Sequence, residues 1–292
     1  MSASAAPADS PLISALRAAL AGHRDAVLRA PPGAGKSTLV PLALLDEPWL
    51  RGRRILLLEP RRVAARAVAR RMAWLRGEQV GATVGYRMRL DTRVSRATRI
   101  EVITEGVLTR MLQGDPELAG VGCVIFDEFH ERSLQADLGL ALCLDARNAL
   151  DAEFRVLVMS ATLDGARVAQ LLDGAPVVDV PGREFPVDIC YRGRGAPLLP
   201  GGPESPEQLV SRTVRHALEE TTGDLLVFLP GAGEIRRVQA QLAALAGASL
   251  QLLPLYGELG AEEQDQALNE SPPRVRRVVL ATNIAETSVT IP

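Results

Sequence analysis

Short apolar runs alternate with amphipathic stretches along most of the chain. The runs are rich in Val, Ile and Leu, as in "RILLLEP" and "RVLVMSAT". Strands that are buried on both faces of a parallel sheet have this continuous apolar pattern. We therefore predict strands at residues 26–30, 54–60, 99–106, 123–128, 155–162, 177–180, 224–230, 250–256 and 277–283.

The stretches between these runs are predicted to be helices. Alternation of strands with helices is typical of parallel sheets whose connections are right-handed crossovers. The expected fold class is therefore α/β with mainly parallel sheets. The predicted helices lie near residues 36–46, 61–76, 106–113, 134–150, 164–172, 205–220, 232–246 and 260–268.

The alternation stops after residue 180. The segment "PGREFPVDICYRGRGAPLLPGGPESPEQ" is rich in Pro, Gly and Arg, which indicates a lobe boundary near 184–187 and an irregular insertion near 192–206. One continuous sheet with a long loop is the alternative. The expected division is a flexible arm at 1–11, a first lobe at 12–185 and a second lobe at 186–292.

Composition limits the kind of partner and the compartment. The net charge of −2 excludes nucleic-acid binding through overall basic charge, so any such contact needs local patches. Cys123, Cys143 and Cys190 are far apart, which favours three buried thiols in a reducing cytoplasm over disulfides or a zinc site. The N-terminus lacks the pattern of a secretory signal, and no apolar run reaches the roughly 18 residues of a membrane span. We expect a cytoplasmic protein with no membrane partner.

The segment "APPGAGKST", residues 30–38, fits the phosphate-loop pattern G-x-x-x-x-G-K-[ST] except at its first position. Ala30 ends a predicted strand there, and the negative φ of a strand suits alanine. The following helix directs its positive end at the loop. Lys36, the only lysine of the chain, is expected to reach the β and γ phosphates of ATP, and Ser37 to hold Mg²⁺. The expected nucleotide-binding residues of this loop are Gly33, Ala34, Gly35, Lys36, Ser37 and Thr38.

A second, acidic element is expected from "CVIFDEFH", residues 123–130. Asp127 and Glu128 follow a buried strand at the sheet edge where α/β folds bind ligands. Asp127 is expected to bind Mg²⁺, Glu128 to act as general base, and His130 to sense the γ-phosphate. An acidic loop after a strand is common by itself, but its pairing with a phosphate loop favours the catalytic interpretation.

These segments together resemble a DEAH-box helicase of superfamily 2, most of all its bacterial HrpB-type branch. "DEFH" is similar to the family's D-E-x-H motif, and the other motifs follow in the family's order. The resemblance implies two RecA-like P-loop lobes, with the second lobe incomplete. The matching segments are "LEPRRVAARA" (58–67), "TEG" (104–106), "SAT" (160–162), "VFLPG" (227–231) and "ATNIAETSVTI" (281–291).

The resemblance also implies roles for residues outside the phosphate loop. Ser160 and Thr162 would couple hydrolysis to unwinding, while the two lobes close on ATP and open after hydrolysis. Arg66 and Arg70 are equally compatible with a solvated helix face. The residues expected to contact a single nucleic-acid strand are Arg61, Arg62, Thr104, Thr282 and Asn283, and those expected near the nucleotide are Arg71, Glu286 and Ser288.

The match is expected to stop before the family's motif VI, since no arginine follows Arg277. An arginine finger contributes roughly a thousandfold or more to phosphoryl transfer, so a chain truncated here is expected to bind ATP·Mg²⁺ but to hydrolyse it slowly. RNA is favoured over DNA by the resemblance alone, and no protein partner is indicated. Two alternatives remain open: a P-loop ATPase without helicase activity, and a nucleic-acid-binding module with an impaired ATPase.

Overall fold

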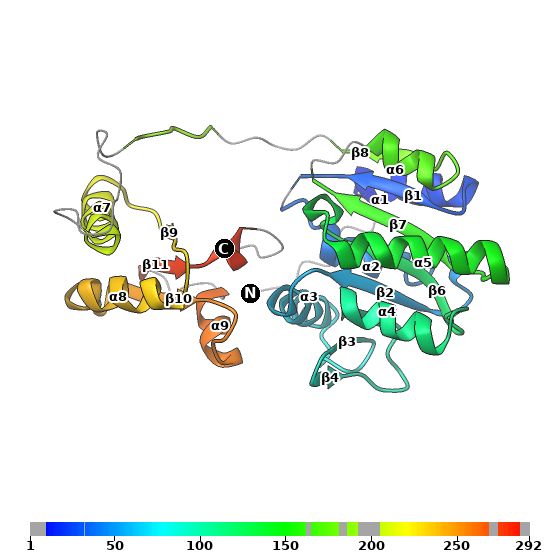
Figure 1. Ribbon diagram of the computed structural model, residues 1–292, viewed down its shortest axis with the longest axis horizontal. Helices are drawn as coiled ribbons and strands as arrows, with labels where there is room; N and C mark the ends of the chain where they lie inside the picture. The colour runs from blue at the N-terminus through cyan, green and yellow to red at the C-terminus, as the bar shows by residue number, and fades with distance from the viewer. Residues whose placement is uncertain are drawn as a thin grey trace. The chain divides into compact units, whose positions relative to one another are not determined.

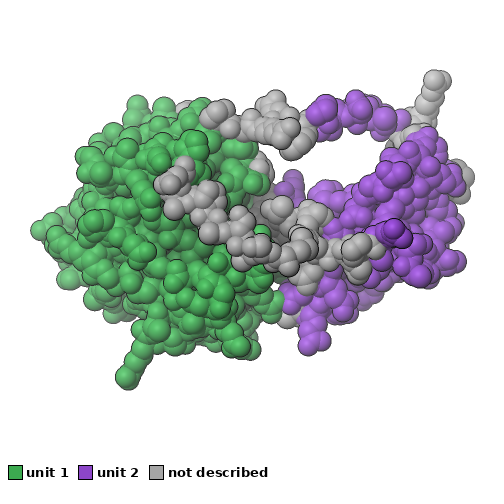
Figure 2. All heavy atoms as spheres, turned by 180° about the vertical axis from the view of Figure 1, so that it is seen from behind, with its two compact units in different colours: residues 1–184 green, residues 185–292 purple. Residues whose placement is uncertain are grey.

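The computed structural model of the chain divides into two compact units, residues 1–184 and 185–292 (Figure 2). It describes residues 10–31, 33–161, 165–180, 186–191, 205–268 and 274–286. Within these ranges, no helix is both long and apolar enough to cross a membrane. Most of the expected flexible arm, residues 192–204 of the expected insertion at 192–206, and the coupling and nucleotide residues Thr162 and Ser288 lie outside the described residues.

The described part of the first unit contains an eight-stranded sheet with the order β4-β3-β5-β2-β6-β7-β1-β8. Every neighbouring pair is parallel except β3 and β4, which form an antiparallel edge. This arrangement confirms the expected α/β class with mainly parallel strands. The strands are β1 (Ala26–Arg29), β2 (Arg54–Glu59), β3 (Val84–Met88), β4 (Asp91–Arg93), β5 (Ile100–Thr104), β6 (Val121–Phe126), β7 (Arg155–Ser160) and β8 (Val177–Asp179).

Helices cover both faces of this sheet (Figure 1). One face packs against α1, α2 and α3, and the other against α4, α5 and α6. Two short 3-10 turns lie in the connections: η1 (Pro48–Leu50) between α2 and β2, and η2 (Phe129–Glu131) between β6 and α5. The helices are α1 (Pro11–Gly22), α2 (Lys36–Leu44), α3 (Arg62–Leu75), α4 (Glu105–Gly114), α5 (Leu134–Leu150) and α6 (Gly165–Leu171).

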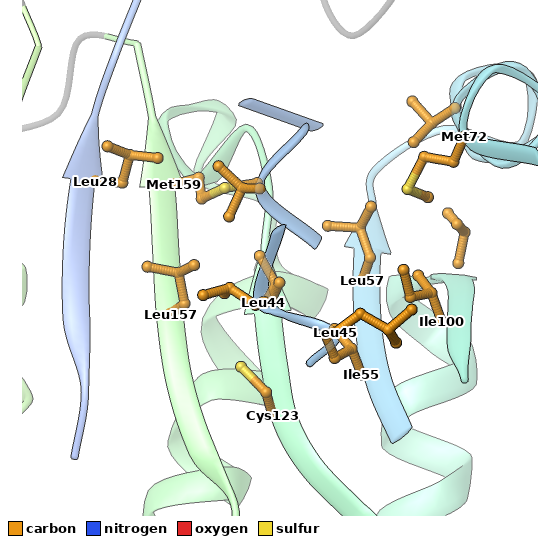
Figure 3. Packing of buried hydrophobic residues seen from close by; sticks show 14 of the residues in the cluster. Leu28, Leu44, Leu45, Ile55, Leu57, Met72, Ile100, Cys123, Leu157 and Met159 are labelled. Atoms are coloured by element: carbon orange, nitrogen blue, oxygen red, sulfur yellow. The ribbon is translucent and has the colours of Figure 1, made fainter. Parts of the chain in front are cut away.

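The apolar run of β2 supplies both layers of the core. Ile55 and Leu57 point into the cluster beneath α1 to α3, whereas Leu56 and Leu58 point into the opposite cluster. Figure 3 shows Ile55 and Leu57 among the labelled side chains of the first cluster. Successive side chains of a strand alternate between faces, so a strand covered on both sides needs an uninterrupted apolar run. Each fully buried leucine or isoleucine contributes about 1.5–3 kcal/mol.

Two parts of the first unit were not expected. Helix α1 begins at Pro11, inside the expected flexible arm, and its N-cap Ser10 accepts a hydrogen bond from the Ile13 amide. Strands β3 and β4 form the edge of the sheet where only an unassigned stretch was expected. Their polar and glycine residues give a weak strand pattern, because an edge hairpin does not need a continuous apolar run.

The described part of the second unit has a three-stranded parallel sheet with the order β10-β11-β9. A capping box at Ser205 starts α7, in which Ser205 and Gln208 exchange hydrogen bonds. The elements are α7 (Pro206–Glu220), β9 (Leu225–Phe228), α8 (Ala232–Leu242), η3 (Ala243–Leu245), β10 (Leu250–Leu255), α9 (Ala261–Leu268), β11 (Arg276–Ala281) and η4 (Asn283–Ala285).

One expectation about this unit is wrong. Cys190 is exposed, whereas Cys123 and Cys143 are buried. Cys190 lies in the extended segment 186–191, in which Val187, Ile189 and Tyr191 are exposed as well. The wide spacing of the three cysteines therefore did not show which of them are buried.

Candidate functional site

The predicted site residues of the first unit lie where parallel strands end. Strands β2, β6, β7 and β1 are consecutive neighbours, and their carboxyl ends meet at one edge of the sheet. This topology brings Ala30, Asp127 and Ser160 to the same edge. Ligands of open α/β sheets bind in this position.

The phosphate loop has the backbone that its glycines predict. Gly33 and Gly35 have φ angles of 78° and 77°, in the left-handed region that favours glycine. A Cβ on Gly35 would also lie 2.8 Å from Leu39 Cδ1. Ala30 is buried and donates its N–H to the Ser160 carbonyl at 3.0 Å, so alanine fits the first position of the loop.

Lys36 begins α2 and is buried. Its Nζ donates a hydrogen bond of 2.7 Å to Glu128 Oε1, and both side chains are less than a tenth exposed. The N–H groups in the first turn of a helix have no partner within the helix, so the start of α2 suits an anion. The loop cation and the acidic motif are thus in contact.

Asp127 follows β6 and lies beside this ion pair. Its Oδ1 accepts the Glu128 backbone N–H at 2.8 Å, whereas the buried Oδ2 has no hydrogen-bond partner among the described residues. Burial raises the pKa of Asp127, as does the charge of Glu128, while Lys36 and the Ser37 hydroxyl act against the rise. An unsatisfied buried carboxylate oxygen beside a phosphate loop fits a Mg²⁺ ion and its water shell.

Glu59 is a third carboxylate at this edge, and the sequence analysis did not assign it. It ends β2 and is fully buried, and neither of its carboxylate oxygens receives a hydrogen bond from a donor group in the described part of the chain. Burial raises the pKa of Glu59 well above its ordinary value, as do the charges of Asp127 and Glu128 and a hydrogen bond shared with the Asp127 carboxyl. The available signal was the glutamate that ends the run "ILLLE", since a buried strand rarely ends on an acid without a partner.

His130 connects the acidic motif with the segment after β7. Its Nδ1 lies 3.3 Å from Glu128 Oε2, and the Ala161 N–H points to the same nitrogen at 3.5 Å. When Nδ1 carries a hydrogen, it can donate to the Glu128 carboxylate. When Nδ1 carries none, it can accept from the Ala161 N–H, so only one of these bonds forms at a time. Glu128 and Arg132 flank η2 and have φ angles of 49° and 51°. This left-handed conformation costs a non-glycine residue on the order of 1 kcal/mol or more.

Two of the arginines predicted to bind nucleic acid or nucleotide, Arg61 and Arg71, have partners within the first unit. Arg61 lies 3.5 Å from the carboxylate of Glu131. Arg71 is exposed and stacks over the Trp74 ring at 4.4 Å. Arg62 is exposed at the start of α3, and Thr104 is half-buried at the start of α4.

Arg66 forms an ion pair with Asp91 at 2.9 Å. Tyr86 donates a second hydrogen bond to Asp91 at 3.2 Å. This pairing joins α3 to the β3–β4 edge, so the solvated helix face that the sequence left open does not describe Arg66.

In the second unit, Thr282 and Asn283 follow β11 and line a hollow of about 330 Å³. Arg236 and Tyr256 line the same hollow, and the Arg236 guanidinium lies 5.8 Å from the centre of the Tyr256 ring. Thr282 and Asn283 were predicted from the sequence, whereas Arg236 of α8 and Tyr256, which follows β10, were not. Glu286 is exposed beside η4.

The described residues contain no group of three His, Cys, Asp or Glu side chains that could enclose a metal ion by themselves. A magnesium ion here would need phosphate and water oxygens as additional ligands. Magnesium characteristically keeps several waters and binds proteins through one or two carboxylates plus substrate phosphates.

A family model described as DEAD/DEAH box helicase matches residues 13–171, more than half of the chain. The chain belongs to the DEAD/DEAH box helicase family. Within the matched range lie the phosphate loop, Asp127, Glu128, His130 and Ser160.

Individual members of the family are similar over nearly the whole chain. The ATP-dependent RNA helicase HrpB of Escherichia coli is 54% identical over 91% of this chain. The probable ATP-dependent RNA helicase DHX34 of Homo sapiens is 37% identical over 92% of it. A crystal structure of the E. coli DEAH/RHA helicase HrpB superposes with a TM-score of 0.86 at 52% identity, covering 96% of this chain and 35% of that one.

This chain is much shorter than those relatives. It spans 32% of E. coli HrpB and 24% of human DHX34. The similarity to HrpB confirms the branch that the sequence motifs indicated.

Proposed function

We propose that this chain carries the ATP-hydrolysing core of a helicase that acts on single-stranded nucleic acid, RNA rather than DNA. One observation carries the proposal: the only lysine of the chain contacts the acidic motif at the end of a parallel sheet, 2.7 Å from Glu128. The names of the similar helicases, which refer to RNA and ATP, support the choice of substrate.

Several residues fit a magnesium-bound triphosphate. Gly33 and Gly35 leave room for phosphate oxygens, and Asp127 presents a buried oxygen without a partner in the described part of the chain. Ser37 and Asp127 would hold Mg²⁺, which when bound neutralises charge on the phosphates. Thr38, Ala34 and the first turn of α2 would complete the phosphate cradle.

Lys36 and Glu128 would exchange partners when the nucleotide binds. Without a phosphate, the Lys36 ammonium donates its hydrogen bond to Glu128 Oε1 and occupies that carboxylate oxygen. Phosphate oxygens would draw Lys36 away and free Glu128 to take a proton from the attacking water. His130 Nδ1 would then either donate to Glu128 or accept the Ala161 N–H. The choice between these two hydrogen bonds would couple the γ-phosphate site to the Ser160–Thr162 segment.

The two compact units would correspond to the two RecA-like lobes of such a core. In the first unit, Arg61, Arg62 and Thr104 would bind the sugar-phosphate backbone, and in the second unit Thr282 and Asn283 would do so. Contacts of this kind predict weak sequence preference. Arg71, Glu286 and Ser288 remain predicted nucleotide contacts.

The direct test compares the chain with two variants, Lys36→Ala and Glu128→Gln. Lys36→Ala should lose nucleotide binding at least tenfold, because no other lysine can replace the phosphate contact. Glu128→Gln should bind nucleotide about as well as the parent chain and hydrolyse it roughly a hundredfold or more slowly, since only proton transfer is lost. Binding is measured with a fluorescent ATP analogue, and hydrolysis by phosphate release with and without poly(U) RNA.

Glu101→Gln is a matched control, because Glu101 is a buried carboxylate of the same sheet that pairs with Arg54 and Arg87 instead of Lys36. It should leave nucleotide affinity unchanged. Full ATP hydrolysis by Lys36→Ala would contradict the proposal. Hydrolysis that RNA never stimulates would favour a plain ATPase, and RNA binding without nucleotide affinity would favour a binding module.

A further inference from the structure

Glu59 has no role in the proposed chemistry so far, although it is the most completely buried carboxylate at the site edge. It is 1% exposed, and its oxygens receive no hydrogen bond from a donor group of the described residues; the group within hydrogen-bonding reach is the Asp127 carboxyl. A buried polar atom without a partner lowers the stability of the fold, and more so when it is charged. Such a group is retained in a folded chain when something absent from the protein chain satisfies it.

The register places this carboxylate beside Asp127. Leu58 of β2 is opposite Phe126 of β6, and the Asp127 N–H donates to the Leu58 carbonyl at 3.1 Å. Glu59 and Asp127 are thus the next positions on two adjacent parallel strands. Asp127 Oδ2 also receives no hydrogen bond from a donor group of the described residues, and the two carboxyl groups are within hydrogen-bonding reach of each other.

The local charges are unbalanced. Glu59, Asp127 and Glu128 lie within electrostatic reach of one another, and the cation that acts on Glu59 is Lys36, which already pairs with Glu128. Buried charges need partners, because their transfer from water is expensive. A hydrated divalent cation supplies both the missing positive charge and the missing hydrogen-bond donors.

We propose that Glu59 is a further positioning residue of the metal site, which accepts a hydrogen bond from a water molecule on the Mg²⁺ held by Asp127. The proposal rests on the proposed function, since it presupposes a metal-bound nucleotide at this edge. Contact through water agrees with the absence, among the described residues, of three side chains able to enclose a metal directly. Partners of this outer kind orient the coordination shell and affect metal affinity.

The test is the dependence of nucleotide binding on metal in the variant Glu59→Gln, measured with a fluorescent ADP analogue. The affinity in Mg²⁺ is divided by the affinity in EDTA, which gives a metal-dependence ratio. Glu59→Gln should lower this ratio by about tenfold. The EDTA affinity should stay equal or rise, because a negative charge near the phosphates is removed. A ratio equal to that of the parent chain would overturn the proposal.

Two further variants separate this proposal from the proposed function. Asp127→Asn should lower the ratio at least as much as Glu59→Gln, whereas Glu101→Gln, which alters a buried carboxylate paired with arginines, should leave it unchanged. If Asp127→Asn lowers the ratio and Glu59→Gln does not, only the role of Glu59 fails. If the parent chain shows no metal-dependent nucleotide affinity, the proposed function fails with it.

Thermal melting distinguishes a structural role from a metal-related one. Without metal, Glu59→Gln should melt at the same temperature as the parent chain or higher, because an unpaired buried carboxylate is removed. The rise in melting temperature on adding Mg²⁺ and ADP should be smaller than in the parent. If Glu59→Gln does not fold, Glu59→Met, which fills a similar volume without oxygen, should show the same reduced ratio, and an unreduced ratio there would equally overturn the role.

Discussion

The three thiols of the chain lie in different surroundings. Burial raises the pKa of Cys123 to about 12 and that of Cys143 to about 12. The attacking species in thiol chemistry is the thiolate, whose population at pH 8 is about one in ten thousand when the pKa is 12. Cys190 is exposed, so reagents reach it without any opening of the fold.

We therefore expect one fast-reacting thiol per folded chain. At pH 8, Ellman's reagent should modify one cysteine within minutes, and Cys190→Ser should abolish this fast phase. In denaturant, the parent chain should show three reactive thiols, and Cys190→Ser two. Fast modification of two or more thiols in the folded parent would show that the core around β6 or α5 opens readily.

At the scale of elements, the start of α5 joins two segments of the first unit. The N-cap Ser133 accepts the Ala136 N–H at 2.9 Å and donates its hydroxyl to Glu105 Oε2 at 2.6 Å. Glu105 begins α4, and burial raises its pKa although the Ser133 hydroxyl lowers it. The Ser133 hydroxyl thus caps α5 and donates a hydrogen bond to the carboxylate of Glu105, the first residue of α4.

Ser133→Ala should destabilise the first unit by about 1–2 kcal/mol, since a helix cap and a hydrogen bond to a carboxylate are both lost. The penalty should be larger at pH 8 than at pH 4. The hydroxyl stabilises the charged form of Glu105, so its removal raises the folded-state pKa further, and the added loss of stability grows as pH rises through that pKa. Urea unfolding followed by circular dichroism at both pH values measures it.

Ser205→Ala is the matched control, because Ser205 caps α7 of the second unit through its own capping box. Its penalty should fall on the second unit and should not depend on Glu105. A Ser133→Ala penalty that is equal at both pH values would show that the hydroxyl acts on the helix alone.

For the whole molecule, the net charge of −2 means that binding to a nucleic-acid strand must come from a few local cations. Arg62 is one exposed candidate at the edge of the first unit. Each phosphate contact on a single strand contributes about −0.7 to the slope of log affinity against log salt concentration.

Arg62→Ala should therefore weaken poly(U) binding and make the salt slope less steep by about 0.7, as one phosphate contact is lost. Fluorescence anisotropy from 50 to 300 mM KCl, as a rough working range, measures the slope. Arg110→Ala, which removes an exposed arginine from the middle of α4, should change neither affinity nor slope. An unchanged slope for Arg62→Ala would remove this residue from the predicted strand path.

Much of the site follows from local sequence. The glycines at 33 and 35 adopt the left-handed φ that the phosphate-loop pattern requires, and the buried run before Asp127 forms the strand that ends there. These features depend on a few neighbouring residues, so the amino-acid order is sufficient to predict them. The same is true of the strands and helices whose apolar faces are continuous.

The tertiary structure alone decided which distant side chains meet. The pairing of β2 with β6 places Glu59 beside Asp127, and the docking of α3 on the β3–β4 edge gives Arg66 its partner Asp91. Nothing within "LLLEP" specifies the neighbouring strand, because register is a property of the whole sheet. By itself, the sequence determined the elements with continuous apolar runs or faces and the phosphate-loop and acidic motifs at their ends. The packing of the sheet determined which charges are buried together, since burial and proximity arise only when strands far apart in the chain become neighbours.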